Sequence, residues 1–196
     1  MPWLTISLGG LMVTLFITFG PAAGGLIFDR VGIVEGGLWR LLTAHLVHTD
    51  SQHLAWNLAA LLLLGSYVER AFGWQRMLRA LLVGASVTGL SIALLMPSIG
   101  FYCGLSGVLN TLLLLAMYGL WRVRASPLIW LLGIGSLLKI TAELLLGQAL
   151  LTHTAWASLP EAHLAGWLAG VVCVLGLAWR NRSQGSSLWF GKSRAI

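Results

Sequence analysis

Three apolar stretches of the chain contain polar side chains of the kind that enzymes use in acyl transfer. They are Gly104-Leu-Ser106-Gly107, Ala162-His163 and His53-Leu-Ala-Trp-Asn57. A serine hydroxyl becomes an effective nucleophile when a base takes its proton, and histidine is the usual base. The tetrahedral intermediate then needs hydrogen-bond donors directed at its oxyanion. These residue types therefore favour nucleophilic acyl transfer.

The spacing within these stretches suits helices that meet closely. His53 and Asn57 are four residues apart, so on a helix they share one face, and both can donate hydrogen bonds. His163, Gly166 and Gly170 also share a face, and glycines let membrane helices approach one another. An imidazole on one helix needs such an approach to reach a hydroxyl on the next. Each motif alone is more often simple packing, but the three together are harder to explain in that way.

The composition places these residues in a membrane protein. Apolar residues make up 58% of the 196 residues, charged residues 9%, and the mean hydropathy is +0.86. Soluble chains have roughly 45–50% and about 25%. A soluble enzyme, a disordered chain and a disulfide scaffold are therefore excluded, and the two cysteines are expected to be buried free thiols. Six spans would use roughly 120 residues. We expect an all-α integral membrane protein, a bundle of six transmembrane helices over residues 1–180.

The apolar runs predict where the spans lie. The expected spans are Leu4–Gly20, His53–Val68, Ala80–Met96, Gly104–Trp121, Pro127–Leu151 and His163–Trp179. The connection 21–52 is too long for a turn and too apolar for disorder, so we expect it to fold partly against the membrane surface. Residues 181–196 are rich in serine, glycine and basic residues, and we expect a disordered cytoplasmic tail.

The positive charges predict the orientation in the membrane. With both termini cytoplasmic, nine of the 12 Lys and Arg residues fall inside, Arg30 and Arg40 outside, and Lys139 within a span. Cytoplasmic loops collect such residues, so topology explains the net charge of +6 better than nucleic-acid binding does. His53, Ser106 and His163 then lie roughly 24–25 Å from the cytoplasmic ends of their helices. We expect one site at that depth, opening to the outer face.

The chain resembles the rhomboid family of intramembrane serine proteases. The resemblance covers nearly the whole chain and runs through Trp39-Arg40, His48, His53-x-x-x-Asn57, Gly104-x-Ser106-Gly107 and Ala162-His163-x-x-Gly166-x-x-x-Gly170. It implies a Ser–His dyad without an aspartate, with Ser106 as nucleophile and His163 as general base. It also implies that His53, Asn57 and the backbone N–H of Ser106 stabilise the oxyanion. His48 and the four glycines Gly104, Gly107, Gly166 and Gly170 would support the site.

The resemblance also implies a setting for the reaction. The substrate would be a transmembrane protein cleaved near the membrane surface, and the enzyme would need neither a cofactor nor a metal. We expect it in the lipid bilayer of the bacterial inner membrane, with the site on the periplasmic side.

One position departs from the family pattern. Family members often have an aromatic residue one turn after the serine, stacked on the catalytic histidine, whereas this chain has Asn110. Asn110 could orient His163 by a hydrogen bond instead. This departure, the short chain and the lack of a soluble domain resemble the rhombosortase branch. Its members are thought to process proteins with a C-terminal Gly-Gly, transmembrane helix and basic tail.

Two charged residues within the fifth expected span have two interpretations. Lys139 and Glu143 are four residues apart on an otherwise apolar helix, so an ion pair would lower the cost of burying both. Alternatively, Glu143 lies about 24 Å from Pro127 along the helix, near the depth of the dyad, and contacts substrate.

Three other functions compete with this interpretation. The first is a catalytically inactive rhomboid-like scaffold that binds transmembrane clients, although inactive relatives usually lack the serine or the histidine. The second is a zinc site formed by His45, His48 and His53, but no His-Glu-x-x-His motif is present. The third is a transporter, which would need polar residues around a midplane site rather than toward one face.

Overall fold

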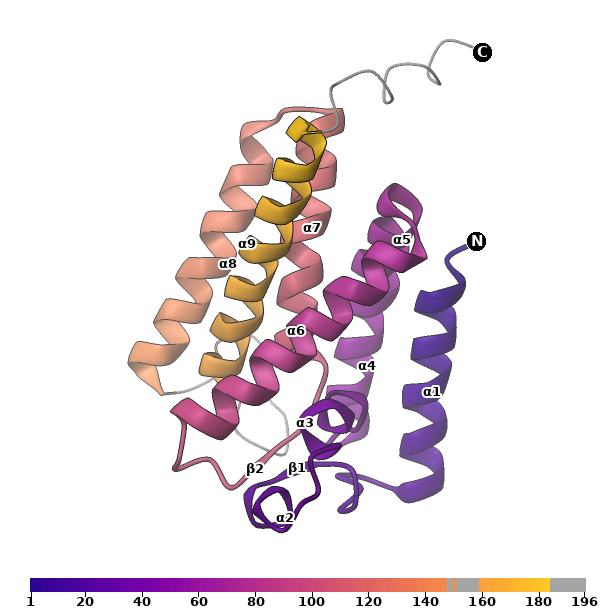
Figure 1. Cartoon of the computed structure of the whole chain (residues 1–196), viewed down its shortest axis with the longest axis vertical. Helices are drawn as coiled ribbons and strands as arrows, with labels where there is room; N and C mark the ends of the chain where they lie inside the picture. Colours follow the sequence, from indigo (N-terminus) through magenta and orange to yellow (C-terminus); the bar gives the residue numbers. More distant parts are fainter. Residues whose placement is uncertain (148–149, 151–158, 184–196) are drawn as a thin grey trace.

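The computed structural model describes residues 1–147, 150 and 159–183 (Figure 1). Its longer helices are α1 (Trp3–Phe19), α4 (Ser51–Ala60), α5 (Ser66–Phe72), α6 (Trp74–Leu95), α7 (Ser106–Val123), α8 (Pro127–Leu146) and α9 (Pro160–Ser183). A π-helical segment, η2 (Leu61–Gly65), joins α4 to α5 without a break. Most of the tail that we expected to be disordered, residues 184–196, lies outside the described residues.

The connection after α1 folds into several short elements. They are β1 (Phe28–Asp29), α2 (Arg30–Val34), α3 (Arg40–Thr43) and the 3-10 helix η1 (Ala44–Leu46). β1 pairs antiparallel with β2 (Phe101–Tyr102), with Phe28 opposite Tyr102 and Asp29 opposite Phe101. Figure 1 shows these elements together at one end of the bundle, whereas the N-terminus and the end of α9 lie at the other end. The all-α prediction thus missed one very short strand pair.

Several predicted helix boundaries differ from the structure. The basic segment 74–79, predicted as loop, forms the first turns of α6, and Gly73 alone separates α5 from α6 at a φ of +86°. The first turns of α6 are amphipathic, with both apolar and basic residues. Because the spans were predicted from continuous apolar runs, these turns were assigned to a loop. α7 begins at Ser106 rather than Gly104, and α8 ends at Leu146, before the left-handed Gly147.

Four helices in the described part of the chain are long and apolar enough to cross a membrane. They are α6, α7, α8 and the Pro160–Asn181 part of α9. α1 is apolar but shorter, with 17 residues. The structure is therefore a helical membrane protein with four candidate spans, where the sequence predicted six.

Close packing of α7 against its neighbours forms the centre of the bundle. α9 and α6 are its main partners, and α8 packs against α9 and α7. A core of apolar side chains including Met12, Leu61, Met77 and Leu112 joins α1, η2, α6 and α7. Lipid is as apolar as these side chains, so association in a membrane depends on fit and on small residues rather than on burial alone.

Two charged side chains cap the ends of helices by hydrogen bonding to backbone groups there. Arg30 donates to four carbonyl groups at the end of α6 and just beyond, those of Ile92, Ala93, Met96 and Ile99, at 2.8–2.9 Å. Glu69 on α5 accepts from the backbone N–H groups of Leu4 and Thr5 in the first turn of α1, at 2.9 and 2.8 Å. Both satisfy backbone groups that a helix end leaves without partners. Neither role was predicted from the sequence.

Candidate active site

Ser106 is the first residue of α7, directly after a sharp turn. Gly104 precedes it with a φ of +110°, which favours glycine, and its N–H donates to the carbonyl of Ala44 at 2.9 Å. The hydroxyl of Tyr102 donates to the carbonyl of Gly104 at 3.0 Å and holds the same turn. The N–H groups in the first turn of a helix lack intrahelical partners and carry partial positive charge. Ser106 therefore lies where a developing anion is favoured.

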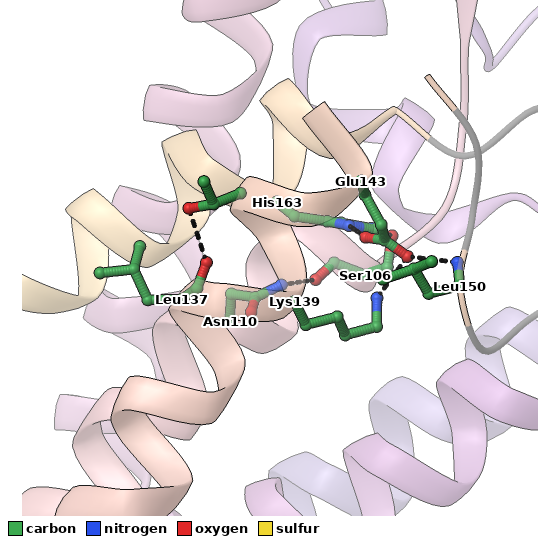
Figure 2. A network of polar contacts seen from close by, with 8 residues as sticks. Ser106, Asn110, Leu137, Lys139, Glu143, Leu150 and His163 are labelled. Carbon is green, nitrogen blue, oxygen red and sulfur yellow. Dashed lines mark hydrogen bonds and ion pairs between the residues drawn. The ribbon is translucent and has the colours of Figure 1, made fainter. Parts of the chain in front are cut away.

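His163 lies in the first turn of α9 with its ring against Ser106. Its Nε2 is 3.0 Å from Oγ of Ser106 (Figure 2). The helices meet closely because Gly166 lies against Gly107, where a Cβ on Gly166 would overlap the Gly107 carbonyl group. Oγ1 of Thr111 donates to the carbonyl of Gly166 at 2.7 Å and ties α7 to α9. The structure thus brings the predicted serine and histidine together.

Gly170 extends this contact one turn further along α9. A Cβ there would lie 2.9 Å from Cβ of Leu114 on α7. The four glycines singled out in the sequence therefore all lie at close approaches, three of them between α7 and α9.

His53 and Asn57 face the same region from α4. The ring of His53 covers Gly104, because a Cβ on that glycine would lie 2.5 Å from the ring. Asp50 caps α4 by accepting from the backbone N–H of His53 at 2.7 Å. Nδ2 of Asn57 donates to the carbonyl of His53 at 2.9 Å, which uses one of its two N–H donors. The second donor is available to an anion.

Thr49 controls which nitrogen of His53 carries a proton. Its Oγ1 lies 3.1 Å from Nδ1 of His53 and 2.9 Å from Oδ2 of Asp50. Because the hydroxyl donates its proton to the Asp50 carboxylate, its oxygen is left to accept from Nδ1–H of His53. Neutral His53 then has no proton on Nε2, and its ring can donate from Nε2 to an oxyanion only when it is protonated. Thr49 was not among the site residues predicted from the sequence.

A cavity of about 700 Å³ connects these side chains. Its lining includes Ser106, His163, His53, Asn57 and Glu143. This volume is in the range of small-molecule and peptide side-chain sites. The arrangement offers a nucleophile, a base and several donors around one space, which is what acyl transfer needs.

His48 supports the site by packing. It is fully buried, and its ring lies edge-on to that of His53 with centroids 5.0 Å apart. Burial, assisted by the nearby His53, lowers the pKa of His48 to about 3, against the pull of Asp50. Burial likewise lowers the pKa of His45 to about 4. Both rings are therefore neutral at physiological pH.

No group of three or more His, Cys, Asp or Glu side chains in the described part of the chain is arranged to hold a metal. The zinc alternative considered from the sequence thus finds no such group there.

Trp39 and Arg40 stabilise the turn that follows α1. Nε1 of Trp39 donates to the carbonyl of Gly25 at 3.1 Å, and Nη1 of Arg40 donates to those of Gly24 and Ile27 at 2.6 and 3.1 Å. This pair shapes the connection that follows α1, and none of these bonds involves Ser106 or His163.

Asn110 does not orient His163 in the way that the sequence suggested. Its Nδ2 donates to the carbonyl of Ser106 at 2.9 Å, one turn back on the same helix (Figure 2). Among the described residues it has no hydrogen bond to His163. The intrahelical carbonyl is the nearer acceptor for a short amide side chain, which explains the difference.

Lys139 and Glu143 form the ion pair that their spacing suggested. Nζ of Lys139 donates to Oε1 of Glu143 at 2.7 Å. The other carboxylate oxygen, Oε2, lies 3.7 Å from Nδ1 of His163. The spacing placed Glu143 near the depth of the dyad but could not reveal this approach to His163, because the approach depends on how α8 is rotated against α9.

Comparison with known proteins identifies the family of this chain. Residues 35–180 match the family model described as the Rhomboid domain, and this range includes every residue of the site. The chain belongs to the rhomboid family. The resemblance seen in the sequence is thereby confirmed at the level of the family.

A rhomboid relative is similar over part of the chain. The chain is 35% identical over 118 residues to "Rhomboid protease GluP" of Bacillus subtilis (strain 168). The match covers 58% of this chain and 22% of that protein, so the chain spans about a fifth of its length.

Proposed function

We propose that this rhomboid is an intramembrane serine protease that cleaves membrane-anchored proteins. The observation that carries the proposal is the 3.0 Å approach of Nε2 of His163 to Oγ of Ser106 at the wall of the cavity. This distance is within hydrogen-bond range, as general-base catalysis requires. The family membership and the name of the Bacillus relative support the same reaction.

The proposed reaction proceeds through an acyl-enzyme. Oγ of Ser106 attacks the carbonyl carbon of the scissile peptide bond while its proton passes to Nε2 of His163. The oxyanion is stabilised by the backbone N–H of Ser106, by the second N–H of Asn57 and by the imidazole of His53, which donates when its Nε2 carries a proton. His163 then protonates the leaving amine, the C–N bond breaks, and water hydrolyses the ester by the reverse proton path.

We further propose six spans with both chain ends in the cytoplasm. The unbroken helical run through α4, η2 and α5 covers 51–72, long enough to cross a bilayer, and α1 is within the usual range of lengths. Six crossings agree with the N-terminus and the end of α9 at the same end of the bundle (Figure 1). The excess of Lys and Arg at that end supports a cytoplasmic assignment. The site would then open to the periplasmic face of an inner membrane.

A narrower proposal concerns the substrate. Asn110, at the position where an aromatic residue often follows the serine, favours the rhombosortase branch. Its substrates would carry a C-terminal Gly-Gly, a transmembrane helix and a basic tail. Two glycines at the scissile bond would also suit the close approach of substrate backbone to Ser106, since glycine has no side chain to exclude.

Labelling with a fluorophosphonate tests the proposed activity. Purified protein in detergent should react at Ser106, and the variants Ser106→Ala and His163→Ala should lose labelling. Ser7→Ala, on an exposed position of α1, is the matched control and should label normally. Absence of labelling in correctly folded protein would contradict the proposal and favour the inactive scaffold that binds transmembrane clients.

A cleavage assay tests the narrower substrate proposal. A membrane-anchored reporter with a Gly-Gly before its transmembrane helix should be cut, and the same reporter with Val-Val should be cut much more slowly. Equal cleavage of both reporters would reject the rhombosortase assignment and leave the protease proposal intact.

A further inference from the structure

The carboxylate of Glu143 is buried beside the histidine of the dyad. Its side chain is completely buried, although it lies on α8, whose other face carries many exposed apolar residues. Figure 2 shows it projecting from α8 toward His163. Burying a charge in this way is costly, so the charge needs compensation.

The two oxygens of this carboxylate have different surroundings. Oε1 accepts from Nζ of Lys139 at 2.7 Å and from the backbone N–H of Leu150 at 3.0 Å. Oε2 is buried and has no hydrogen-bond partner among the described residues. It lies 3.7 Å from Nδ1 of His163. One oxygen therefore anchors the side chain, and the other faces the imidazole.

The other ring nitrogen of His163, Nε2, already has a partner in Ser106. Nε2 of His163 lies 3.0 Å from Oγ of Ser106, so the serine, the imidazole and the carboxylate form a continuous series from α7 through α9 to α8. A carboxylate at Nδ1 favours the tautomer whose proton is on Nδ1 and whose Nε2 is free to accept. Hydrogen bonds at such sites are often long without substrate and shorten in the reacting complex.

We propose that Glu143 is a positioning residue that completes a Ser106–His163–Glu143 triad in this rhomboid. This proposal rests on the proposed protease function and extends the catalytic group from two residues to three. Lys139 and the N–H of Leu150 hold the carboxylate in place. Glu143 fixes the tautomer of His163 and stabilises the imidazolium that forms when the base takes a proton.

The proton balance of the step is simple. As the bond between Oγ of Ser106 and the carbonyl carbon forms, the hydroxyl proton moves to Nε2 of His163. The proton on Nδ1 stays on the ring, and this N–H donates a hydrogen bond to Oε2 of Glu143, which remains ionised. When the peptide C–N bond breaks, the proton on Nε2 passes to the leaving amine, and the imidazole is neutral again.

The other ionisable groups around His163 do not provide the same contact. Lys139 on α8 is directed to Oε1 of Glu143, and Glu161 lies two residues away on α9 and lines the same cavity. His53 on α4 faces the cavity from the side of the oxyanion. Glu143 is the carboxylate that the structure pairs with Nδ1.

Charge-removing variants test the proposal against a purely structural ion pair. Glu143→Gln should lower the rate of fluorophosphonate labelling by about 100- to 10,000-fold, and in a cleavage assay lower kcat with little change in KM. Glu143→Asp retains the charge and should restore part of the rate. Thr141→Val, on an exposed position of α8, is the control and should label normally.

The double variant Lys139→Met/Glu143→Gln decides between the two roles. If Glu143 serves only to neutralise Lys139, removing both charges should return the rate to that of wild type, and the proposal is overturned. If Glu143 acts on His163, the double variant should remain as slow as Glu143→Gln. Unfolding temperatures of all variants show that the comparison is made between folded proteins.

A measurement that does not depend on activity tests the contact itself. With ¹⁵N-labelled histidine, wild type should show a far-downfield proton on Nδ1 of His163, assigned by its loss in His163→Ala. Glu143→Gln should shift this signal strongly upfield. An unshifted signal would overturn the triad even in a protein that fails to label. Labelling of wild type with no slowing in Glu143→Gln would overturn the triad but leave the protease proposal standing.

Discussion

Replacement of Gly166 by alanine should separate the dyad without touching either member. A Cβ at this position overlaps the carbonyl group of Gly107, whereas ordinary contacts between such atoms are about 3.5 Å or longer. α9 must therefore withdraw from α7 by on the order of 1 Å or more. The 3.0 Å distance between Nε2 of His163 and Oγ of Ser106 would grow to about 4 Å, beyond hydrogen-bond range.

The expected loss follows from that displacement. A misplacement of this size costs roughly 100-fold in rate, or about 2.7 kcal/mol in the barrier. The bond from Thr111 to the carbonyl of Gly166 is strained by the same movement, and overpacking costs a further 1–3 kcal/mol or so of stability. Fluorophosphonate labelling and thermal unfolding in detergent measure the two effects.

A second glycine on the same helix provides the matched control. Gly176 has nothing within 4 Å of an added Cβ, so Gly176→Ala should label as wild type does and unfold at the same or a higher temperature. If Gly166→Ala labels as fast as Gly176→Ala, the contact between α7 and α9 does not set the dyad distance, and the reasoning is refuted.

Two further predictions concern stability. Arg30→Ala should lower the free energy of unfolding by about 2–4 kcal/mol, because four carbonyl groups near the end of α6 lose a charged donor. Arg30→Lys should recover only part of this loss. Unchanged unfolding temperatures would reject the capping role. The buried neutral rings of His45 and His48 should make the protein less stable in acid, because only the unfolded chain takes up protons on these rings below about pH 6.5. Their contribution to the free energy of unfolding is fully present above about pH 6.5. Below it, about 1.4 kcal/mol is lost per histidine and pH unit, down to about pH 4 for His45 and about pH 3 for His48. Unfolding temperatures that do not fall between about pH 7 and about pH 5 would contradict this account.

The residues of the site were predictable because their chemistry is unusual in a membrane helix. Ser106, His163, His53 and Asn57 stand out against apolar neighbours, and equal distances along straight helices were enough to predict that they lie around one site. The same reasoning offered the ion pair between Lys139 and Glu143 as one of two interpretations, since spacing of four residues on one helix is a local property.

Features that depend on rotation or on contacts between distant segments were not predictable. The approach of Glu143 to His163 is fixed by the rotation of α8, which no spacing within α8 reveals. The pairing of Phe28 with Tyr102 joins two-residue strands that have no periodic signal. From the sequence, Arg30 was used only as a charge that indicates membrane orientation. A single charged residue in a loop does not reveal which helix end its side chain will cap.

The π-helical segment η2 lets one helix serve two unrelated partners. It lies between Asn57, which faces the cavity, and Glu69, which caps α1. A π-turn holds about one residue more than an α-turn, and one residue corresponds to about 100° of rotation. If all five residues of Leu61–Gly65 wound as a regular α-helix instead, one half of the helix would rotate against the other by roughly 100°. Either the oxyanion donors or the cap would then be misdirected, so the winding of this segment is under a constraint that no single side chain in it carries.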